Sequence, residues 1–250
     1  MSGHSKWSTI KRKKGAADAK RGQLFTRIGR ELAIAAREGG ADAEMNFRLR
    51  LVVDKAKAHN MPKENIERAI RRGAGLEKGD ALEEITYEGY GPGGVAFIVQ
   101  VVTDNRNRAV SEVRRLFTRH GGSLGEAGCV AWLFSPRGLI TTKAEDKDFD
   151  KLFELAVEAG AEDVRTEGDL IEILTTSEDF QSVRNYLADK GLDMEAANIT
   201  LVPGTVAEVD NKAGLQTMAL IDDLEELDDV QNVYSNLDIS DQLLEKYEAA

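Results

Sequence analysis

The chain has 250 residues and a formal net charge of −11 at pH 7, and 42% of its residues are hydrophobic and 31% charged. This composition is typical of a soluble globular protein and too apolar for a mostly disordered one, and the length allows one large domain or two to three smaller ones. The longest apolar run, 95–102, is interrupted by Gln100 and is far shorter than the roughly 20 residues of a membrane span. The single cysteine excludes an intramolecular disulfide. Because the basic N-terminus has no apolar stretch behind it, it does not resemble a secretory signal, and we expect a cytoplasmic protein.

Charge is distributed unevenly along the chain. Residues 1–80 contain 19 of the 33 lysines and arginines but only 10 acidic residues, whereas the other 170 residues carry 14 basic and 34 acidic side chains. The densest basic segment is 1–30, with nine basic residues and one acid. A phosphate backbone responds to the local field, so this basic head indicates an anionic partner despite the acidic net charge.

Helical periodicity dominates the first 80 residues. Apolar residues recur every three or four positions, and glycine or proline marks the ends of each run. The predicted helices cover residues 20–38, 43–60 and 63–72. The predicted inward residues include Leu24, Ile28, Leu32 and Ala35 of the first helix and Met45 of the second. We therefore expect residues 20–73 to form a small helical bundle and residues 1–19 a basic arm.

Beyond residue 80, β-branched and aromatic residues indicate strands. A first series is predicted as strands at 84–90 and 95–103, a helix at 106–120 and a strand at 130–134. A second series is predicted as a strand at 139–142, a helix at 148–158, strands at 164–166 and 169–174, a helix at 178–189 and a strand at 197–202. A last helix and strand are predicted at 212–227 and 230–236.

The second series has the β-α-β-β-α-β order of a ferredoxin-like fold. The last helix and strand have no local partner sheet, but they would complete the first series as a second sandwich of this kind. We therefore predict an α+β protein in which an N-terminal helical bundle is followed by two ferredoxin-like α/β sandwich domains, the last inserted into the middle one. The predicted domains are residues 1–80, residues 81–135 together with 205–250, and residues 136–204.

Several motifs resemble those of the YebC/PmpR family. They are Gly3-His4-Ser5-Lys6-Trp7, Lys20-Arg21-Gly22 followed by Phe25, and the segments 87–94, 104–108 and 228–234. The resemblance extends over essentially the whole chain. It implies a non-enzymatic protein with three domains and a cleft between the α/β domains. Members of that family are described as cytoplasmic DNA-binding transcriptional regulators, and some resemble translational activators or ribosome-associated translation factors.

Two groups of residues are candidates for nucleic-acid contact. The run of bases at 11–14 cannot be buried in a core, so it requires either solvent, as a solvated tail, or an anionic partner. In the second group, helix capping accounts for Asp104 or Asn105 but not for the arginines that follow, which form either an anion-binding patch or a solvated face. The predicted contact residues are Lys6, Trp7, Lys11, Arg12, Lys13, Lys14, Lys20, Arg21, Arg27, Arg30, Arg106 and Arg108.

Other motifs predict no catalytic, cofactor or metal site. The glycine-rich segment 89–94 lies between two predicted strands, whereas a dinucleotide loop leads into a helix. The three histidines share no ligand spacing with Cys129, which we interpret as a small buried residue, and the acidic run 222–229 is interpreted as a solvated face. No helix-turn-helix or RNA-recognition signature is present, so duplex DNA and structured RNA or the ribosome are both possible partners, and the oligomeric state is open.

Overall fold

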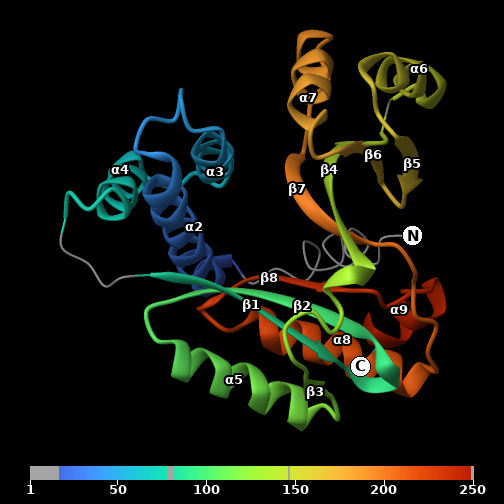
Figure 1. The fold of residues 1–250 in the computed structure, drawn as a ribbon. Helices are drawn as coiled ribbons and strands as arrows, with labels where there is room; N and C mark the ends of the chain where they lie inside the picture. The colour runs from blue at the N-terminus through green and yellow to red at the C-terminus, as the bar shows by residue number, and fades with distance from the viewer. Residues whose placement is uncertain (1–16, 78–81, 146, 249–250) are drawn as a thin grey trace. The chain divides into compact units, whose positions relative to one another are not determined.

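The structure is a computed structural model that describes residues 17–77, 82–145 and 147–248. These residues belong to two compact units (Figure 1). One unit contains residues 132–206, and the other contains the described residues before 132 and after 206. The finer division into three domains remains a prediction. Within the described ranges, no helix has the length and apolar character needed to cross a membrane.

The N-terminal helices are α2 (Ala17–Gly39), α3 (Phe47–Ala58) and α4 (Lys63–Gly73), which confirms the predicted helical bundle. Its core is formed by apolar residues from all three helices, including Ile28, Leu32, Ala35, Leu49, Ala56, Ile66 and Ala69. Gly73 lets α4 approach α2 closely, because a Cβ atom at this position would lie 2.1 Å from the carbonyl oxygen of Ala33. The apolar stripe predicted for the first helix lies in this core, because Ile28, Leu32 and Ala35 are buried and Leu24 packs against them.

The second helix begins later than predicted, and Met45 is not part of its inward face. The Asn46 side chain accepts a hydrogen bond from the Leu49 amide at 3.0 Å and donates one to the Ala35 carbonyl oxygen at 2.7 Å, so Asn46 caps α3 and joins it to α2. Met45 lies in the turn before this cap and is 84% exposed. The interpretation of Met45 as a core residue was wrong because a buried cap ends the helical periodicity at Asn46.

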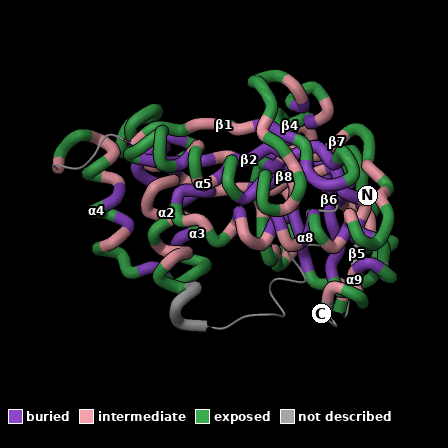
Figure 2. Tube along the Cα trace, turned by 90° about the horizontal axis from the view of Figure 1, so that it is seen from below, coloured by how far each residue is buried: buried purple, intermediate pink, exposed green. Residues whose placement is uncertain are grey.

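The larger unit also contains a four-stranded antiparallel sheet, sheet A, with the strand order β3-β1-β2-β8. Its strands are β1 (Glu83–Tyr90), β2 (Ala96–Thr103), β3 (Ser123–Leu124) and β8 (Val230–Ser235), and its helices are α5 (Arg106–Arg119), α8 (Asn211–Glu225) and α9 (Asp241–Glu248). Figure 1 shows α5 and α8 on the same side of the sheet. The ring of Phe97 on β2 meets the ring of Phe117 on α5 edge to face, with 5.5 Å between centroids. As Figure 2 shows, buried residues are concentrated along β2, the central strand.

The smaller unit has its own antiparallel sheet, sheet B, with the order β5-β6-β4-β7. Its elements are β4 (Phe134–Lys143), α6 (Phe149–Ala159), β5 (Asp163–Glu167), β6 (Leu170–Thr176), α7 (Phe180–Asp189) and β7 (Ala196–Pro203). This β-α-β-β-α-β succession is the predicted ferredoxin-like order. The chain enters and leaves this unit between α5 and α8, which belong to the larger one. The predicted α+β fold is thus confirmed.

The strand predicted at 130–134 is wrong. Residues Ala131–Leu133 form a short 3₁₀ turn, and β4 begins only at Phe134. The buried carboxylate of Glu88 on β1 explains this turn. It accepts hydrogen bonds from the backbone amides of Gly128, Val130 and Ala131 at 2.6, 2.8 and 2.8 Å. Amides bound to a side chain cannot join a strand ladder, so the loop closes over β1 instead.

Candidate nucleic-acid interface

Part of the predicted contact set falls outside the described residues. This applies to Lys6, Trp7, Lys11, Arg12, Lys13 and Lys14, and also to the side chain of Lys20, whose backbone lies in α2. The remaining residues occupy two places in the larger unit. Arg21, Arg27 and Arg30 lie on α2, and Arg106 and Arg108 lie in the first turn of α5.

Arg30 and Arg108 both bind the carboxylate of Asp229, which lies just before β8. Arg30 Nη1 is 2.8 Å from Asp229 Oδ1, and Arg108 Nη2 is 2.8 Å from Asp229 Oδ2. The Thr103 hydroxyl at the end of β2 also donates a hydrogen bond to Oδ2, at 2.7 Å. Arg30 also donates to the carbonyl oxygen of Asp228. Two residues predicted to bind nucleic acid are therefore joined by one buried acid.

The electrostatics of this cluster follow from its geometry. Burial alone would raise the pKa of Asp229, but the hydrogen bonds from Arg108 and Thr103 and the charge of Arg30 outweigh burial and lower it. The same contact with Asp229 raises the pKa of Arg108. Asp229 is only 5% exposed, so the interpretation of the acidic run as a solvated face was wrong at this residue. Sequence periodicity cannot show this, because the partners come from distant elements.

The other two arginines of α2 differ in their surroundings. Arg21 is exposed, and its guanidinium carbon lies 5.4 Å from the centre of the Phe25 ring, a cation–π contact that leaves its charge toward solvent. Arg27 is half-buried, and its Nε has no hydrogen-bond partner among the residues that the structure describes. Burial lowers the pKa of the Arg27 guanidinium, while the charges of Glu225, Asp228 and Glu31 act in the opposite direction. Arg21 is thus the accessible member of the pair.

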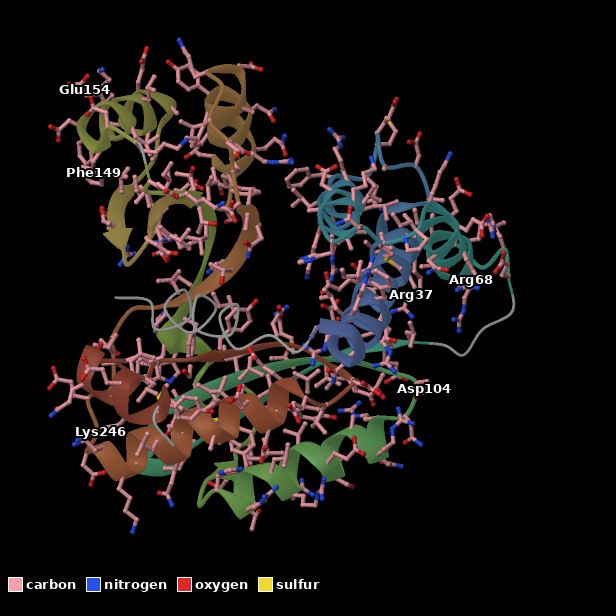
Figure 3. All side chains as sticks on the ribbon, turned by 180° about the vertical axis from the view of Figure 1, so that it is seen from behind. Arg37, Arg68, Asp104, Phe149, Glu154 and Lys246 are labelled. Atoms are coloured by element: carbon pink, nitrogen blue, oxygen red, sulfur yellow. The ribbon has the colours of Figure 1, made fainter. Side chains whose placement is uncertain are left out.

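Further basic residues of the bundle form ion pairs with acidic side chains. Arg48 pairs with Glu38 and with Glu84 of β1, and Lys55 pairs with Glu31. Arg68 and Arg72 on α4 are exposed and form no ion pair within the described residues. Figure 3 labels Arg68 and Arg37 among the side chains of the bundle. The positive charge available to a ligand here is therefore smaller than the count of basic residues indicates.

Helix α5 carries exposed arginines, of which the predicted contact set included Arg106 but omitted Arg114 and Arg115. Arg106, Arg114 and Arg115 are exposed and form no ion pair within the part of the chain that the structure describes, whereas Arg119 lies 3.3 Å from Asp223. Figure 3 labels Asp104, the residue before the Asn105 cap of α5, and nitrogen-tipped side chains extend along this helix. The spacing of the arginines along one predicted helix was the sequence signal for this face.

No group of histidine, cysteine and acidic side chains suited to a metal ion is found among the described residues. Cys129 is partly exposed rather than buried, and the Tyr90 hydroxyl donates a hydrogen bond to its carbonyl oxygen at 3.1 Å. What the described geometry offers chemically is a set of guanidinium groups at the surface of the larger unit. Such groups bind phosphate and carboxylate with paired hydrogen bonds.

Known proteins are similar to this chain in both sequence and fold. The family profile described as the TACO1/YebC protein N-terminal domain matches residues 5–76, and the profile of the TACO1/YebC second and third domain matches residues 82–237. A probable transcriptional regulatory protein of Dictyoglomus thermophilum is 54% identical over 98% of this chain and 99% of its own length. One from Geobacter sulfurreducens is 55% identical with the same coverage.

The crystal structure of a conserved hypothetical protein from Aquifex aeolicus is 46% identical to this chain, with a TM-score of 0.84. The match covers 90% of this chain and 93% of that one. The resemblance read from the sequence motifs is confirmed by these matches, which span nearly the whole chain. This chain belongs to the TACO1/YebC family.

Proposed function

We propose that this protein is a non-enzymatic regulator of gene expression that binds nucleic acid, and that it acts in transcription on duplex DNA in the cytoplasm. One observation carries the proposal: 19 of the 33 lysines and arginines lie in the first 80 residues, in a chain whose net charge is −11. Such a local concentration attracts a phosphate backbone even when the whole protein is acidic. The relatives named as probable transcriptional regulatory proteins support the assignment to transcription.

The arginines and lysines of the head have different roles in this proposal. The bases at 11–14, together with Arg21, make the primary phosphate contacts. Arg30 and Arg108 form ion pairs with Asp229. In this proposal they stabilise the positions of α2 and α5 and do not contact phosphate. Contacts of this kind position a protein on a nucleic acid but read no bases. The proposed activity is therefore docking by charge.

The test is a binding measurement at several salt concentrations, with the full chain and three ligands: duplex DNA, single-stranded RNA and purified ribosomes. The variant K11Q/R12Q/K13Q/K14Q should bind duplex DNA more weakly. The slope of log affinity against log salt should fall by about 0.9 for each phosphate that the variant no longer binds. Its matched control, K147Q/K190Q/K212Q/K246Q, removes four exposed lysines from the acidic part of the chain and should leave the slope unchanged.

Two results would contradict the proposal. Equal salt slopes for the wild type and the arm variant would remove the arm as the contact surface. Strong co-sedimentation with ribosomes, with DNA binding lost at physiological salt, would favour a translation factor that docks on structured RNA through the same basic surface.

A further inference from the structure

Helix α6 of the smaller unit carries an apolar row that the fold leaves exposed. Phe149, Phe153 and Val157 are spaced four residues apart, so they follow one another along one face of the helix. They are between 36% and 53% exposed, and the rings of Phe149 and Phe153 are neighbours, with 6.2 Å between their centroids. Exposed apolar residues are ordinary when they are scattered, but a contiguous row of three indicates an interaction surface.

This row is separate from the residues through which α6 packs in its own unit. The packed face of the helix contains Leu152 and Ala156, which are buried. Because successive residues of an α-helix are rotated by about 100°, Phe153 lies about 100° around the helix from Leu152. The apolar surface of α6 is therefore wider than the part that the smaller unit covers.

A row of acidic side chains lies beside the apolar row, on the side away from the packed face. Its members repeat the same spacing one position later: Asp150, Glu154 and Glu158. All three are exposed, and none forms an ion pair within the described residues. Figure 3 labels one residue of each row, Phe149 and Glu154. The single basic residue of α6, Lys151, lies 3.2 Å from Asp148, which caps the helix. The apolar row therefore borders negative charge that no described residue neutralises.

The acidic row does not stabilise the helix that carries it. Like charges four residues apart repel each other, and Glu158 lies in the last turn, where the helix dipole disfavours negative charge. Residues 145–158 contain six acidic and two basic side chains, so negative charge dominates around α6. An acidic row that weakens its own helix, beside an exposed apolar row, is expected where a positively charged partner binds.

We propose that the exposed face of α6, formed by the apolar row and the acidic row, binds a basic amphipathic helix of a partner protein. Apolar side chains of that helix cover the apolar row, and lysines or arginines along its flank face the acidic row, as in helix pairs whose flanking charges select the partner. The acidic row repels nucleic acid and anionic membranes, and it also repels the same face of a second copy of this chain. Binding at α6 is independent of nucleic-acid binding by the larger unit.

The test uses the full chain and a synthetic helical peptide of about 20 residues, with leucines at every third or fourth position and lysines along one flank. A second peptide has glutamate in place of each lysine. The lysine peptide should bind, as measured by calorimetry, and should shift the backbone amide signals of Phe153 and Val157 in NMR spectra. Its affinity should fall as salt is added, and the glutamate peptide should not bind.

Two variants separate the contribution of the charges from that of the apolar row. D150N/E154Q/E158Q should weaken binding of the lysine peptide on the order of tenfold and remove most of its salt dependence. F149S/F153S should weaken binding to a similar degree but keep the salt dependence, because it removes apolar area and no charge. Circular dichroism checks that both variants remain folded.

A matched control separates this face from the general acidity of the chain. D169N/E178Q/D189N neutralises three exposed acids of the same unit outside α6 and should bind the lysine peptide like the wild type. Equal weakening in this control and in the α6 charge variant, or equal binding of the two peptides, would overturn the site.

Other occupants of this face would give different results. Self-association of the wild type in sedimentation experiments, lost in F149S/F153S, would identify a second copy of this chain as the occupant and refute a partner protein. Loss of duplex-DNA binding in a folded F149S/F153S variant would assign α6 to the nucleic-acid surface, with the same consequence. A wild-type protein that binds the lysine peptide at α6 but does not bind DNA would refute the proposed function and support this site.

Discussion

Arg30 on α2 and Asp229 before β8 form an ion pair, with 2.8 Å between Arg30 Nη1 and Asp229 Oδ1. The Asp229 side chain is 6% exposed and that of Arg30 is 19% exposed, so the contact is largely shielded from water. Through its second oxygen, the same carboxylate holds Arg108 of α5 and Thr103 of β2. One acid therefore joins helix α2 of the bundle to strand β2 and to helix α5.

Replacement of Asp229 by asparagine should destabilise the larger unit. D229N leaves two arginines without their shared counter-ion, and we expect a decrease of about 2–3 kcal/mol in the free energy of unfolding. Urea denaturation followed by circular dichroism measures this decrease. E67Q is the control, because Glu67 pairs with exposed Lys63 and its replacement should cost less than about 1 kcal/mol. Similar decreases in both variants would mean that the Asp229 cluster is not a structural junction.

The Glu88 carboxylate should make stability depend on pH. Burial acts to raise the pKa of Glu88, but hydrogen bonds from the amides of Gly128, Val130 and Ala131 lower it below its ordinary value. A carboxylate with a lowered folded pKa stabilises the protein fully above its ordinary pKa of about 4.3 and loses this contribution as pH falls through the folded pKa. The difference in unfolding free energy between the wild type and E88Q should therefore be largest near pH 7 and shrink below about pH 4. A difference that stays constant from pH 7 to pH 3 would contradict this role.

The order of the main helices and strands was predictable because it depends on local periodicity. The stripe containing Ile28 and Leu32 identified α2, and both residues are fully buried. The β-α-β-β-α-β succession identified sheet B in the same way. These signals lie within single helices and strands, so they can be recognised without knowledge of tertiary contacts.

Features that depend on distant residues were not predictable. The loop before β4 takes its shape from Glu88, which lies some forty residues earlier in the chain. From the sequence, Asp228 and Asp229 are expected to be two solvated charges. In the structure, Asp229 is buried and paired with arginines from α2 and α5. For the candidate site, the sequence indicates that basic residues are abundant. Only the fold distinguishes Arg108, which is paired with Asp229, from Arg114, which has no ion pair within the described ranges.

The thiol of Cys129 should react slowly with alkylating reagents. Burial raises its pKa, and the negative charge of Glu88 acts in the same direction. Because the thiolate is the reactive form, the rate of reaction with iodoacetamide should reach half of its maximum at a higher pH in the folded protein than in the urea-unfolded chain. Mass spectrometry of samples quenched across a pH series measures both profiles. The same midpoint in folded and unfolded protein would show that the fold does not perturb this thiol.

The approach of α4 to α2 should depend on the absence of a side chain at Gly73. A Cβ atom there would lie 2.1 Å from the Ala33 carbonyl oxygen and 2.6 Å from its Cα, and backbone atoms cannot move aside as a side chain does. We therefore expect G73A to destabilise the bundle by about 1–3 kcal/mol. Gly22 on α2 provides the same substitution without the clash, because a Cβ atom at that position would meet no described atom within 4 Å. G22A should stabilise the protein by about 0.5–1 kcal/mol, since alanine favours the helix and restricts the unfolded chain. Thermal unfolding of the two variants should thus shift in opposite directions, and a G73A variant as stable as G22A would show that the two helices are not in close contact at this point.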